Sequence, residues 1–387
     1  MNDIPNPSKD WSLEKFGVGQ PVPRAEDPRL LRGQGCYTDD VSLPGQAHAW
    51  MVRSPHAHGV IRGIDLAAAR AMPGVLAIVT GKDLQAAGYP MIKPAASFPN
   101  RDGSAMVVPP RPALTSDKVR YVGDAVACVI AETVLQARDA AEAVVLDIDP
   151  LPAVTRASAA VAPGAPQLHA GTPGNVVLDY HYGEADKVAA AFAAAAHVTR
   201  LDLLNNRLVA SPIEPRAALA EYDVASGRYT FHVGSQGAFG MRNNIASDVL
   251  GVPPEKVRVL TGNVGGSFGM KSAIYSEYAC LLYGAKLLGR PVKWADDRSG
   301  SFVSDQHGRD HELVAELALD KDGRFLAIRV TGVGNMGAYL GNFGLLISTL
   351  NIVKNMVGGY ATPAMEVSMR CVVTNTTPIG PYRGAGR

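Results

Sequence analysis

The chain has 387 residues, of which 47% are hydrophobic and 19% charged, and its formal net charge is +1. This length suits two or three domains with substantial cores, and the balanced charge excludes a strongly basic nucleic-acid or membrane surface. No apolar run is long enough to cross a bilayer and the first residues are polar, so we expect a cytoplasmic protein without membrane insertion.

The pattern along the chain predicts an α+β or α/β protein in two parts. Residues 1–20 are rich in proline, asparagine and glycine and are expected to form an extended arm. Short strands and helices alternate over residues 21–157. Residues 158–175 contain three prolines and three glycines, which predicts a linker between domains. A second α/β region, residues 176–387, opens with an alanine-rich helix over residues 186–197.

A strand-turn-helix unit occurs twice in succession in the second region. The strand at residues 228–233 leads through the turn at 234–237 to a helix that should end at Gly251. A second strand from Val257 leads through four glycines in eight residues to a helix that should end at Gly289. Such turns expose backbone N–H groups at the positive end of a helix. We therefore predict two anion sites at one sheet edge, with a phosphate-bearing cofactor between them.

Two nucleotide motifs are matched only in part. Lys271 follows a glycine turn, but Met270 occupies the position where a P-loop needs glycine. Residues 332–337 fit a dinucleotide fingerprint, yet no acidic residue lies between Asp322 and Glu366 to hold a ribose. We interpret these later glycines as residues of a crowded turn.

The sequence also allows a serine hydrolase. Residues 265–269 read G-x-S-x-G between a strand and a helix, which would place Ser267 on a nucleophile elbow. Candidate acids and histidines follow, although they leave little chain for intervening βα units: Asp297, Asp305, His307 and His311. The two histidines could also face a metal ion, but Gly308 weakens a helix between them, and we expect them to be framework residues.

The four cysteines stand far apart and form no C-x-x-C pair: Cys36, Cys128, Cys280 and Cys371. They cannot hold an iron–sulfur cluster as a local motif, and we expect buried free thiols.

Several motifs, in this order, resemble the large molybdopterin-binding subunit of the molybdenum hydroxylases, the family of xanthine dehydrogenase and aerobic carbon monoxide dehydrogenase. They are VPRAEDPRLLRGQGCYTDDVSLPG (22–45), SPHAHGVI (54–61), KVRYVGDAVACVIAE (118–132), NNRLVASPIEPRAALAEYD (205–223), SQGAFGMRNNIASDVLGVPPEKVRV (235–259), GNVGGSFGMK (262–271), RPVKWADDRS (290–299), HGRDH (307–311) and PYRGAGR (381–387). The resemblance covers nearly the whole chain.

The resemblance implies an a/b hammerhead domain at residues 21–157 and the first part of a molybdopterin-binding domain at 176–387, incomplete at its C-terminus. It also implies which residues meet the cofactor. Gln236 would approach an oxo group of the metal, with Gly237 beside it, and Arg383 would lie close to the metal centre. The second turn would wrap the pterin, with Phe268 shaping the substrate pocket: Gly266, Ser267, Phe268 and Gly269. No residue is implied as a direct metal ligand.

Three positions depart from the family pattern. Gly384 stands where carbon monoxide dehydrogenases carry the cysteine that binds copper, which argues against carbon monoxide as substrate. Ser272 replaces the glutamate of purine-oxidising members, so a purine is not implied. Ser267 replaces a glycine, and a positive φ angle there would strain the backbone.

By resemblance, the function is oxidative hydroxylation of an aldehyde or aromatic heterocycle at a molybdenum–molybdopterin cofactor, with the cytosine dinucleotide form expected. Electrons would pass to a 2Fe–2S small subunit and an FAD medium subunit. Family large subunits are about twice as long, so we expect a second molybdopterin-domain polypeptide or a missing C-terminal half, and no activity without it. The alternatives are the Ser267 hydrolase and a truncated, non-catalytic relic.

Overall fold

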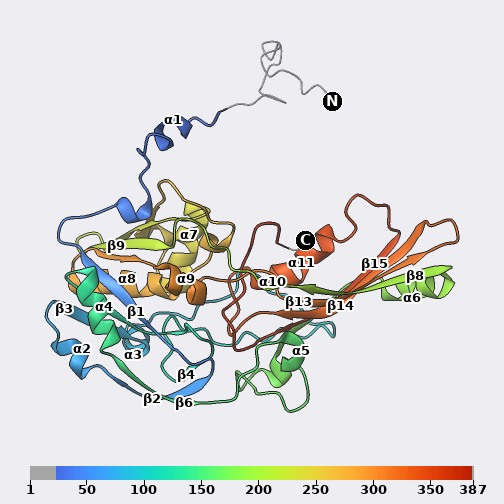
Figure 1. The fold of residues 1–387 in the computed structure, drawn as a ribbon, viewed down its shortest axis with the longest axis horizontal. Coiled ribbons are helices and arrows are strands. Elements are labelled where there is room, and N and C mark those ends of the chain that lie inside the picture. Colours follow the sequence, from blue (N-terminus) through green and yellow to red (C-terminus); the bar gives the residue numbers. More distant parts are fainter. Residues whose placement is uncertain (1–22, 386–387) are drawn as a thin grey trace, which may run out of the picture.

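The computed structural model describes residues 23–385, so the predicted arm at residues 1–20 lies outside the described part. A seven-stranded sheet forms the centre of the broader body on the left of Figure 1, with the order β11-β10-β9-β12-β1-β5-β3. Its strands are β1 (Ala47–Arg53), β3 (Val75–Thr80), β5 (Ala125–Ala131), β9 (Ala217–Asp223), β10 (Arg228–Val233), β11 (Val257–Leu260) and β12 (Val292–Ala295).

This sheet joins the two halves of the chain. Strand β1 pairs with β12 in parallel, Ala47 opposite Val292, so strands from the N-terminal region continue directly into the sheet of the second region. A small sheet of order β4-β2-β6 adjoins the N-terminal strands. Its strands and the nearby helices are β2 (Gly59–Asp65), β4 (Lys118–Val119), β6 (Val145–Pro150), α2 (Ala67–Ala71), α3 (Gly81–Ala86) and α4 (Val134–Glu142).

A five-stranded sheet extends as an arm to the right of Figure 1, with the order β7-β15-β14-β13-β8. Its strands are β7 (Val176–Gly183), β8 (His197–Asn205), β13 (His311–Leu319), β14 (Phe325–Asn335) and β15 (Ala364–Val372). The helices around it are α5 (Ala157–Ala160), α6 (Ala185–Ala194), α10 (Gly344–Ser348) and α11 (Leu350–Asn355). The predicted helix over residues 186–197 ends at Ala194, because His197 already begins β8.

Residues 158–175 connect the N-terminal strands to this arm and pack against it. Leu168, Thr172 and Asn175 are each no more than 1% exposed. The Asn175 side chain donates to the carbonyl groups of Ala160 and Pro166. The proline- and glycine-rich segment is thus an ordered part of a core.

Both strand-turn-helix units form as predicted. After β10, α7 (Ala238–Asn244) continues as a π-helical stretch (Ile245–Leu250), and Gly251 ends it with φ 63°. After β11, α8 (Ser276–Leu288) ends at Gly289 with φ 60°. These are the left-handed C-terminal positions that favour glycine. Strands β10 and β11 are parallel neighbours, so the two turns lie at the same sheet edge.

Short segments complete the described chain: α1 (Asp27–Leu30), α9 (Arg298–Ser304) and 3₁₀ turns at Thr38–Asp40, Pro173–Asn175, Pro254–Lys256 and Met270–Ser272. Of the helices in this part, none is long and apolar enough to cross a membrane. All four cysteines are free; three are buried as expected, but Cys36 is exposed, because it lies in a loop outside the cores.

A buried charge cluster lies between α8, β9 and α9. Arg216, 1% exposed, forms ion pairs with Glu277 at 3.0 Å, Asp305 at 2.5 Å and Asp296 at 3.3 Å. Burial alone would raise the pKa of Glu277, but the attraction of Arg216 and Arg53 lowers this pKa to about 2. Burial raises the pKa of Asp296 to about 6 against the pull of Arg216. One guanidinium therefore neutralises carboxylates from three segments.

Replacing Arg216 by an uncharged residue should strongly destabilise the folded protein. Arg216→Met leaves Asp296 and Asp305 buried without a cation and Glu277 with Arg53 alone, and breaking such a buried pair costs about 3–5 kcal/mol. We expect a loss of this size in the free energy of unfolding measured by urea titration. Arg290→Met removes the exposed pair with Glu132 and should cost far less. Equal losses in the two variants would contradict the central role of Arg216.

Candidate functional site

A cavity of about 590 Å³ opens where the turns after β10 and β11 meet the last described segment of the chain. Its lining includes all the predicted site residues except Gly237: Ser235, Gln236, Val264, Gly266, Ser267, Phe268, Gly269, Pro381, Tyr382, Arg383, Gly384 and Ala385. Three segments far apart in the sequence therefore share one cavity.

Gln236 connects the two glycine turns. Its Oε1 accepts hydrogen bonds from Ser267 Oγ at 2.7 Å and from the Gly269 N–H at 2.9 Å. The Nε2 group has no partner among residues 23–385, and the side chain is exposed. The carbonyl end of the amide thus fixes the second turn, and the NH₂ end stays available as a donor to a ligand.

The second turn offers a row of free backbone donors. Within the described chain, the N–H groups of Gly266, Ser267 and Phe268 donate to no residue. Gly266 and Gly269 have φ angles of 102° and 104°, and Phe268 has 51°. Backbone strain is expected at Ser267, where serine replaces the glycine of the family pattern. The positive φ lies instead at the next residue, so the strained residue is Phe268. Successive N–H groups in such a turn form a concave site for anions or acceptor oxygens.

Glu214 and Lys271 anchor the second turn. Lys271 is 1% exposed, and its ammonium group donates to Glu214 Oε2 at 2.7 Å and to the Glu214 carbonyl at 2.9 Å. Oε2 also accepts from the Gly265 N–H at 2.7 Å. Burial lowers the pKa of Lys271 although Glu214 opposes this shift. Lys271 does not line the cavity, which agrees with the weak P-loop match. Glu214 lies 57 residues earlier in the chain, so no local motif identifies it as the partner of Lys271.

Arg309 holds the last described segment. Its guanidinium donates to the Gly384 carbonyl at 2.9 Å and the Arg383 carbonyl at 3.0 Å and lies over the Tyr382 ring. A Cβ atom at Gly308 would lie 2.3 Å from Tyr382 Cβ, so this close approach requires glycine. The Arg383 side chain is exposed and pairs with no carboxylate in the described part of the chain.

The chemistry of the lining limits what the cavity can bind. Among the described residues, the lining contains no Cys, His, Asp or Glu side chain and so offers none of the usual ligands for direct metal coordination. It offers instead the Gln236 amide, three backbone N–H groups and the Arg383 guanidinium. Donors of this kind suit an oxygen-rich or anionic ligand that carries its own metal ligands. The residues present therefore fit a molybdopterin group.

The groups needed for a serine hydrolase lie apart. Ser267 Oγ donates to Gln236, while Asp305 pairs with Arg216. His307 Nδ1 accepts from Arg207 at 3.1 Å, and burial together with Arg207 lowers the pKa of His307 to about 4. No histidine of residues 23–385 hydrogen-bonds to Ser267. The hydrolase interpretation has no structural support.

The other motifs serve packing. Gly332 and Gly334 lie inside β14, where added Cβ atoms would approach Glu312 O to 2.3 Å and Ser348 Oγ to 2.6 Å. The predicted crowding is confirmed for these two glycines, but the predicted turn is wrong, because both positions lie within a strand. His311 begins β13 and contacts Ser348 Oγ at 2.8 Å. Among the described residues, no group of three or more His, Cys, Asp or Glu could hold a metal ion.

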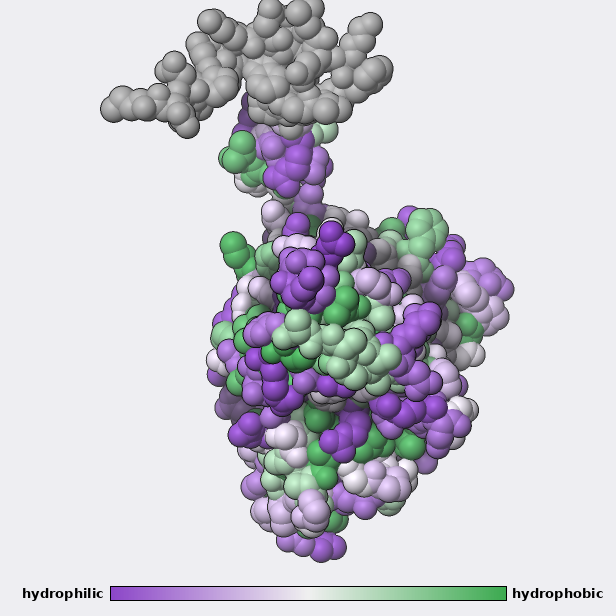
Figure 2. Space-filling view, turned by 90° about the vertical axis from the view of Figure 1, so that its right-hand side faces the viewer, coloured by the Kyte–Doolittle hydropathy of each residue, from purple (hydrophilic) through white to green (hydrophobic). Residues whose placement is uncertain are grey.

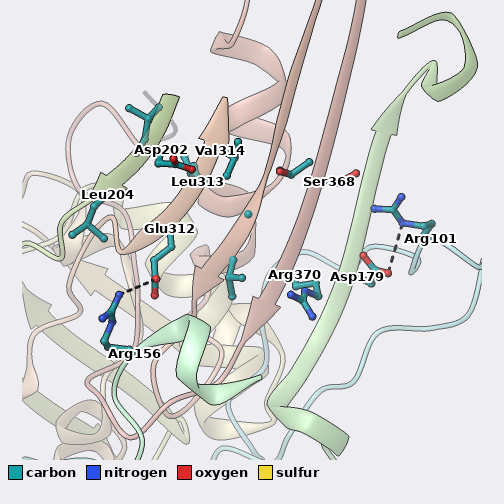
Figure 3. A pocket seen from close by; sticks show the side chains of 14 residues that line it. Arg101, Arg156, Asp179, Asp202, Leu204, Glu312, Leu313, Val314, Ser368 and Arg370 are labelled. Carbon is teal, nitrogen blue, oxygen red and sulfur yellow. Dashed lines mark hydrogen bonds and ion pairs between the residues drawn. The ribbon is translucent and has the colours of Figure 1, made fainter. Parts of the chain in front are cut away.

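A larger cavity, about 690 Å³, lies on the five-stranded sheet (Figure 3). Its charges are largely paired with one another: Arg156 with Glu312 at 3.2 Å, and Arg101 with Asp179 at 3.7 Å. It shares no residue with the cavity at the glycine turns. Its size alone therefore does not make it the functional site.

Comparison with known proteins agrees with this geometry. The model of the molybdopterin cofactor-binding domain matches residues 168–387, and that of the a/b hammerhead domain of aldehyde oxidase and xanthine dehydrogenase matches residues 32–152. The chain belongs to this family of molybdenum-dependent oxidoreductases and corresponds to part of a molybdenum hydroxylase large subunit.

Three relatives show the extent of the match. Subunit gamma of the 6-hydroxypseudooxynicotine dehydrogenase complex of Paenarthrobacter nicotinovorans is 35% identical over 376 residues, 96% of this chain and 46% of that protein. The large molybdopterin subunit of nicotinate dehydrogenase from Eubacterium barkeri is 29% identical, covering 98% of this chain and 83% of that protein. The crystal structure of quinoline 2-oxidoreductase from Pseudomonas putida 86 superimposes with a TM-score of 0.85 at 32% identity, covering 96% of this chain and 46% of that chain. This chain thus spans about half the length of the first and third of these proteins.

The connection through Gln236 predicts a change in local dynamics. Gln236→Ala removes the acceptor of Ser267 Oγ and the Gly269 N–H, so amide hydrogen exchange at Gly269 should become faster while exchange in α8 stays unchanged. Hydrogen exchange followed by mass spectrometry measures this. Gln167→Ala, whose side chain bonds at a distant loop, is the matched control. Unchanged exchange at Gly269 in Gln236→Ala would show that the contact does not hold the turn.

His311 should make folding sensitive to acid. Burial, reinforced by Arg309, lowers the pKa of His311 from 6.5 to about 4. Protonation therefore favours the unfolded chain, and the contribution of neutral His311 to stability, complete above pH 6.5, is lost as the pH falls toward 4. Between pH 7 and pH 5 the wild type should lose about 2 kcal/mol more than His311→Gln. Urea titrations at both pH values measure this difference; equal losses would contradict the pKa shift.

Proposed function

We propose that this chain forms one side of the molybdenum–molybdopterin site of a cytoplasmic molybdenum hydroxylase. The observation that carries the proposal is the single cavity in which the Gln236 amide, the N–H groups of residues 266–268 and Arg383 are all free to donate. The cytosine dinucleotide form of the cofactor is part of the proposal, as the resemblance of the sequence motifs to the family implies. When bound, the cofactor supplies the two-electron redox chemistry of the hydroxylation.

The chain's own residues position that chemistry. Gln236 Nε2 donates a hydrogen bond to an acceptor oxygen of the cofactor, and its Oε1 keeps the second turn in place. The free N–H groups bind polar edges of the pterin, and Arg383 neutralises negative charge. The Phe268 ring, 40% exposed at the cavity, limits the space open to substrate. The side chains of Val264, Pro381 and Tyr382 add apolar surface on the same cavity.

We propose an aromatic nitrogen heterocycle as substrate, with an aldehyde as the alternative. The names of the relatives acting on quinoline and nicotinate support this class. The lining supports it as well, because apolar side chains beside a few fixed donors suit an apolar ring with polar edges.

We propose partners that complete the enzyme. A second molybdopterin-binding half, on the same or another polypeptide, would close the cavity; the Eubacterium barkeri relative, a subunit of which this chain covers 83%, supports a separate polypeptide. A 2Fe–2S subunit and an FAD subunit would carry electrons away. A cluster needs four thiolates, whereas three of the four cysteines here are buried and scattered.

Three variants of the assembled enzyme test this function. Gln236→Ala and Phe268→Ala should lower kcat, by about 10²–10³ for Gln236 if it is a positioned donor. Ser267→Ala removes two neutral hydrogen bonds, the one donated to Gln236 Oε1 and the one accepted from the Lys271 N–H, each worth about 1 kcal/mol, and should lower kcat by much less than Gln236→Ala does. Molybdenum content and circular dichroism of each variant separate lost chemistry from lost cofactor or fold. Full activity of the Gln236 and Phe268 variants, or loss of activity with fluorophosphonate labelling of Ser267, would overturn the proposal.

A further inference from the structure

Figure 2 shows the outer end of the five-stranded sheet, where hydrophilic residues are spread among hydrophobic ones. At the opposite, inner end, where β8 ends at Asn205 and β13 begins at His311, polar groups instead converge on one cation. This cation is Arg207, whose side chain is 20% exposed. Arg207 does not line the cavity at the glycine turns, so contact with a ligand there does not explain its many partners.

The guanidinium of Arg207 joins three segments of the chain. Its Nε group donates to Asp310 Oδ2 at 2.7 Å. One terminal NH₂ group donates to the Thr377 carbonyl at 2.8 Å and to His307 Nδ1 at 3.1 Å. The other donates to Thr376 Oγ1 at 2.6 Å. Because a guanidinium is planar and presents its donors in a rigid fork, these contacts fix the three segments relative to one another.

A strained turn lies directly before β13. Arg309 and Asp310 have φ angles of 69° and 71°, a left-handed conformation that residues other than glycine adopt only where their surroundings hold them. Asp310 is held at its backbone and its side chain. Its N–H donates to the Asn205 carbonyl at 3.0 Å, and its carbonyl accepts from the Asn335 N–H at 3.0 Å. Its Oδ2 accepts from Arg207 and, at 3.0 Å, from Asn335 Nδ2.

This turn sets the direction in which Arg309 points. The Arg309 guanidinium donates to the carbonyl groups of Arg383 and Gly384, and Arg383 lines the cavity. A change of backbone conformation at residues 309–310 would turn the Cα–Cβ bond of Arg309 and carry its donors away from these carbonyl groups. The contacts of Arg207 therefore control one wall of the cavity from a distance.

We propose that the ion pair of Arg207 and Asp310 positions the Arg383 side of the cavity. The pair holds the left-handed turn, the turn directs Arg309, and Arg309 fixes the carbonyl groups of Arg383 and Gly384. Arg207 and Asp310 are thus positioning residues that act through Arg309. The effect on the segment at residues 383–384 stands without the cofactor, whereas the effect on turnover rests on the proposed function.

Trypsin cleavage after Arg383 measures the segment in the 387-residue chain without cofactor. The carbonyl group that trypsin attacks is one that Arg309 binds, so this bond is cut only when the contact opens. Arg207→Gln and Asp310→Gly should make cleavage of the Arg383–Gly384 bond about tenfold faster, followed by mass spectrometry. Asp310→Asn keeps an acceptor oxygen and tolerates the left-handed conformation, so its rate should stay within about twofold of the wild type.

Two controls separate positioning from general stability. Cleavage after Lys286, within α8, reports unfolding of the body and should keep its rate in all variants. Arg329→Gln removes an ion pair with Glu316 on the same sheet and should leave both rates unchanged. If the aspartate served only to permit the turn, Asp310→Gly would behave at least as well as Asp310→Asn, because glycine adopts a positive φ freely. That result, or unchanged cleavage after residue 383 in Arg207→Gln, would overturn the proposal.

The assembled enzyme connects the segment to turnover. Arg207→Gln and Asp310→Gly should lower kcat per molybdenum by about 10–10²-fold, because a small misplacement of a site group is enough for such a loss. KM should change little, and Asp310→Asn should recover most of kcat. Faster cleavage with unchanged kcat would uphold the positioning of the segment and contradict the place of Arg383 in the proposed function. Unchanged cleavage would overturn the positioning itself, whatever the value of kcat.

Discussion

The two hydrogen bonds accepted by Gln236 Oε1 are the contact on which the site depends. They exist because β10 and β11 are parallel neighbours, which brings two glycine turns to one sheet edge. Since the carbonyl oxygen is used in this way, the amide must direct its NH₂ group elsewhere, and the N–H groups of residues 266–268 remain free. One side chain thereby orders a loop and leaves its donors available for a ligand.

Charge is kept beneath the site and away from its lining. Lys271 and Glu214 are paired against the turn, and Arg216 neutralises Glu277, Asp296 and Asp305 farther inside. Removing one member of such a buried pair costs several kcal/mol of folding free energy, so these ion pairs hold the segments behind the site in place. Of the residues that the structure describes, the lining carries only Arg383 as a charged group. A cofactor with acceptor oxygens would therefore meet donors and one cation, with no competing carboxylate among the lining residues.

Features set by local backbone chemistry could be predicted from the sequence. The helix ends at Gly251 and Gly289 follow from the left-handed C-terminal position, and the shared sheet edge follows from repetition of the strand-turn-helix unit. Features set by distant partners could not. The residue type at position 267 does not reveal that φ is positive at Phe268, and nothing near Lys271 in sequence identifies Glu214 as its partner. Likewise, the composition of residues 158–175 predicts a loop but not the burial of Leu168 and Asn175, because that burial depends on packing against the five-stranded sheet.

The central claim is that this cavity is one side of a molybdopterin site shared with a second half. The most direct measurement is the molybdenum and pterin content of the 387-residue chain, purified alone and after co-expression with a complementary molybdopterin-binding half. Contacts spread over two halves hold a ligand firmly only when both engage it. We expect little molybdenum in the chain alone and about one atom per complex. A full equivalent of molybdenum in the chain alone, or none in the complex, would contradict the account.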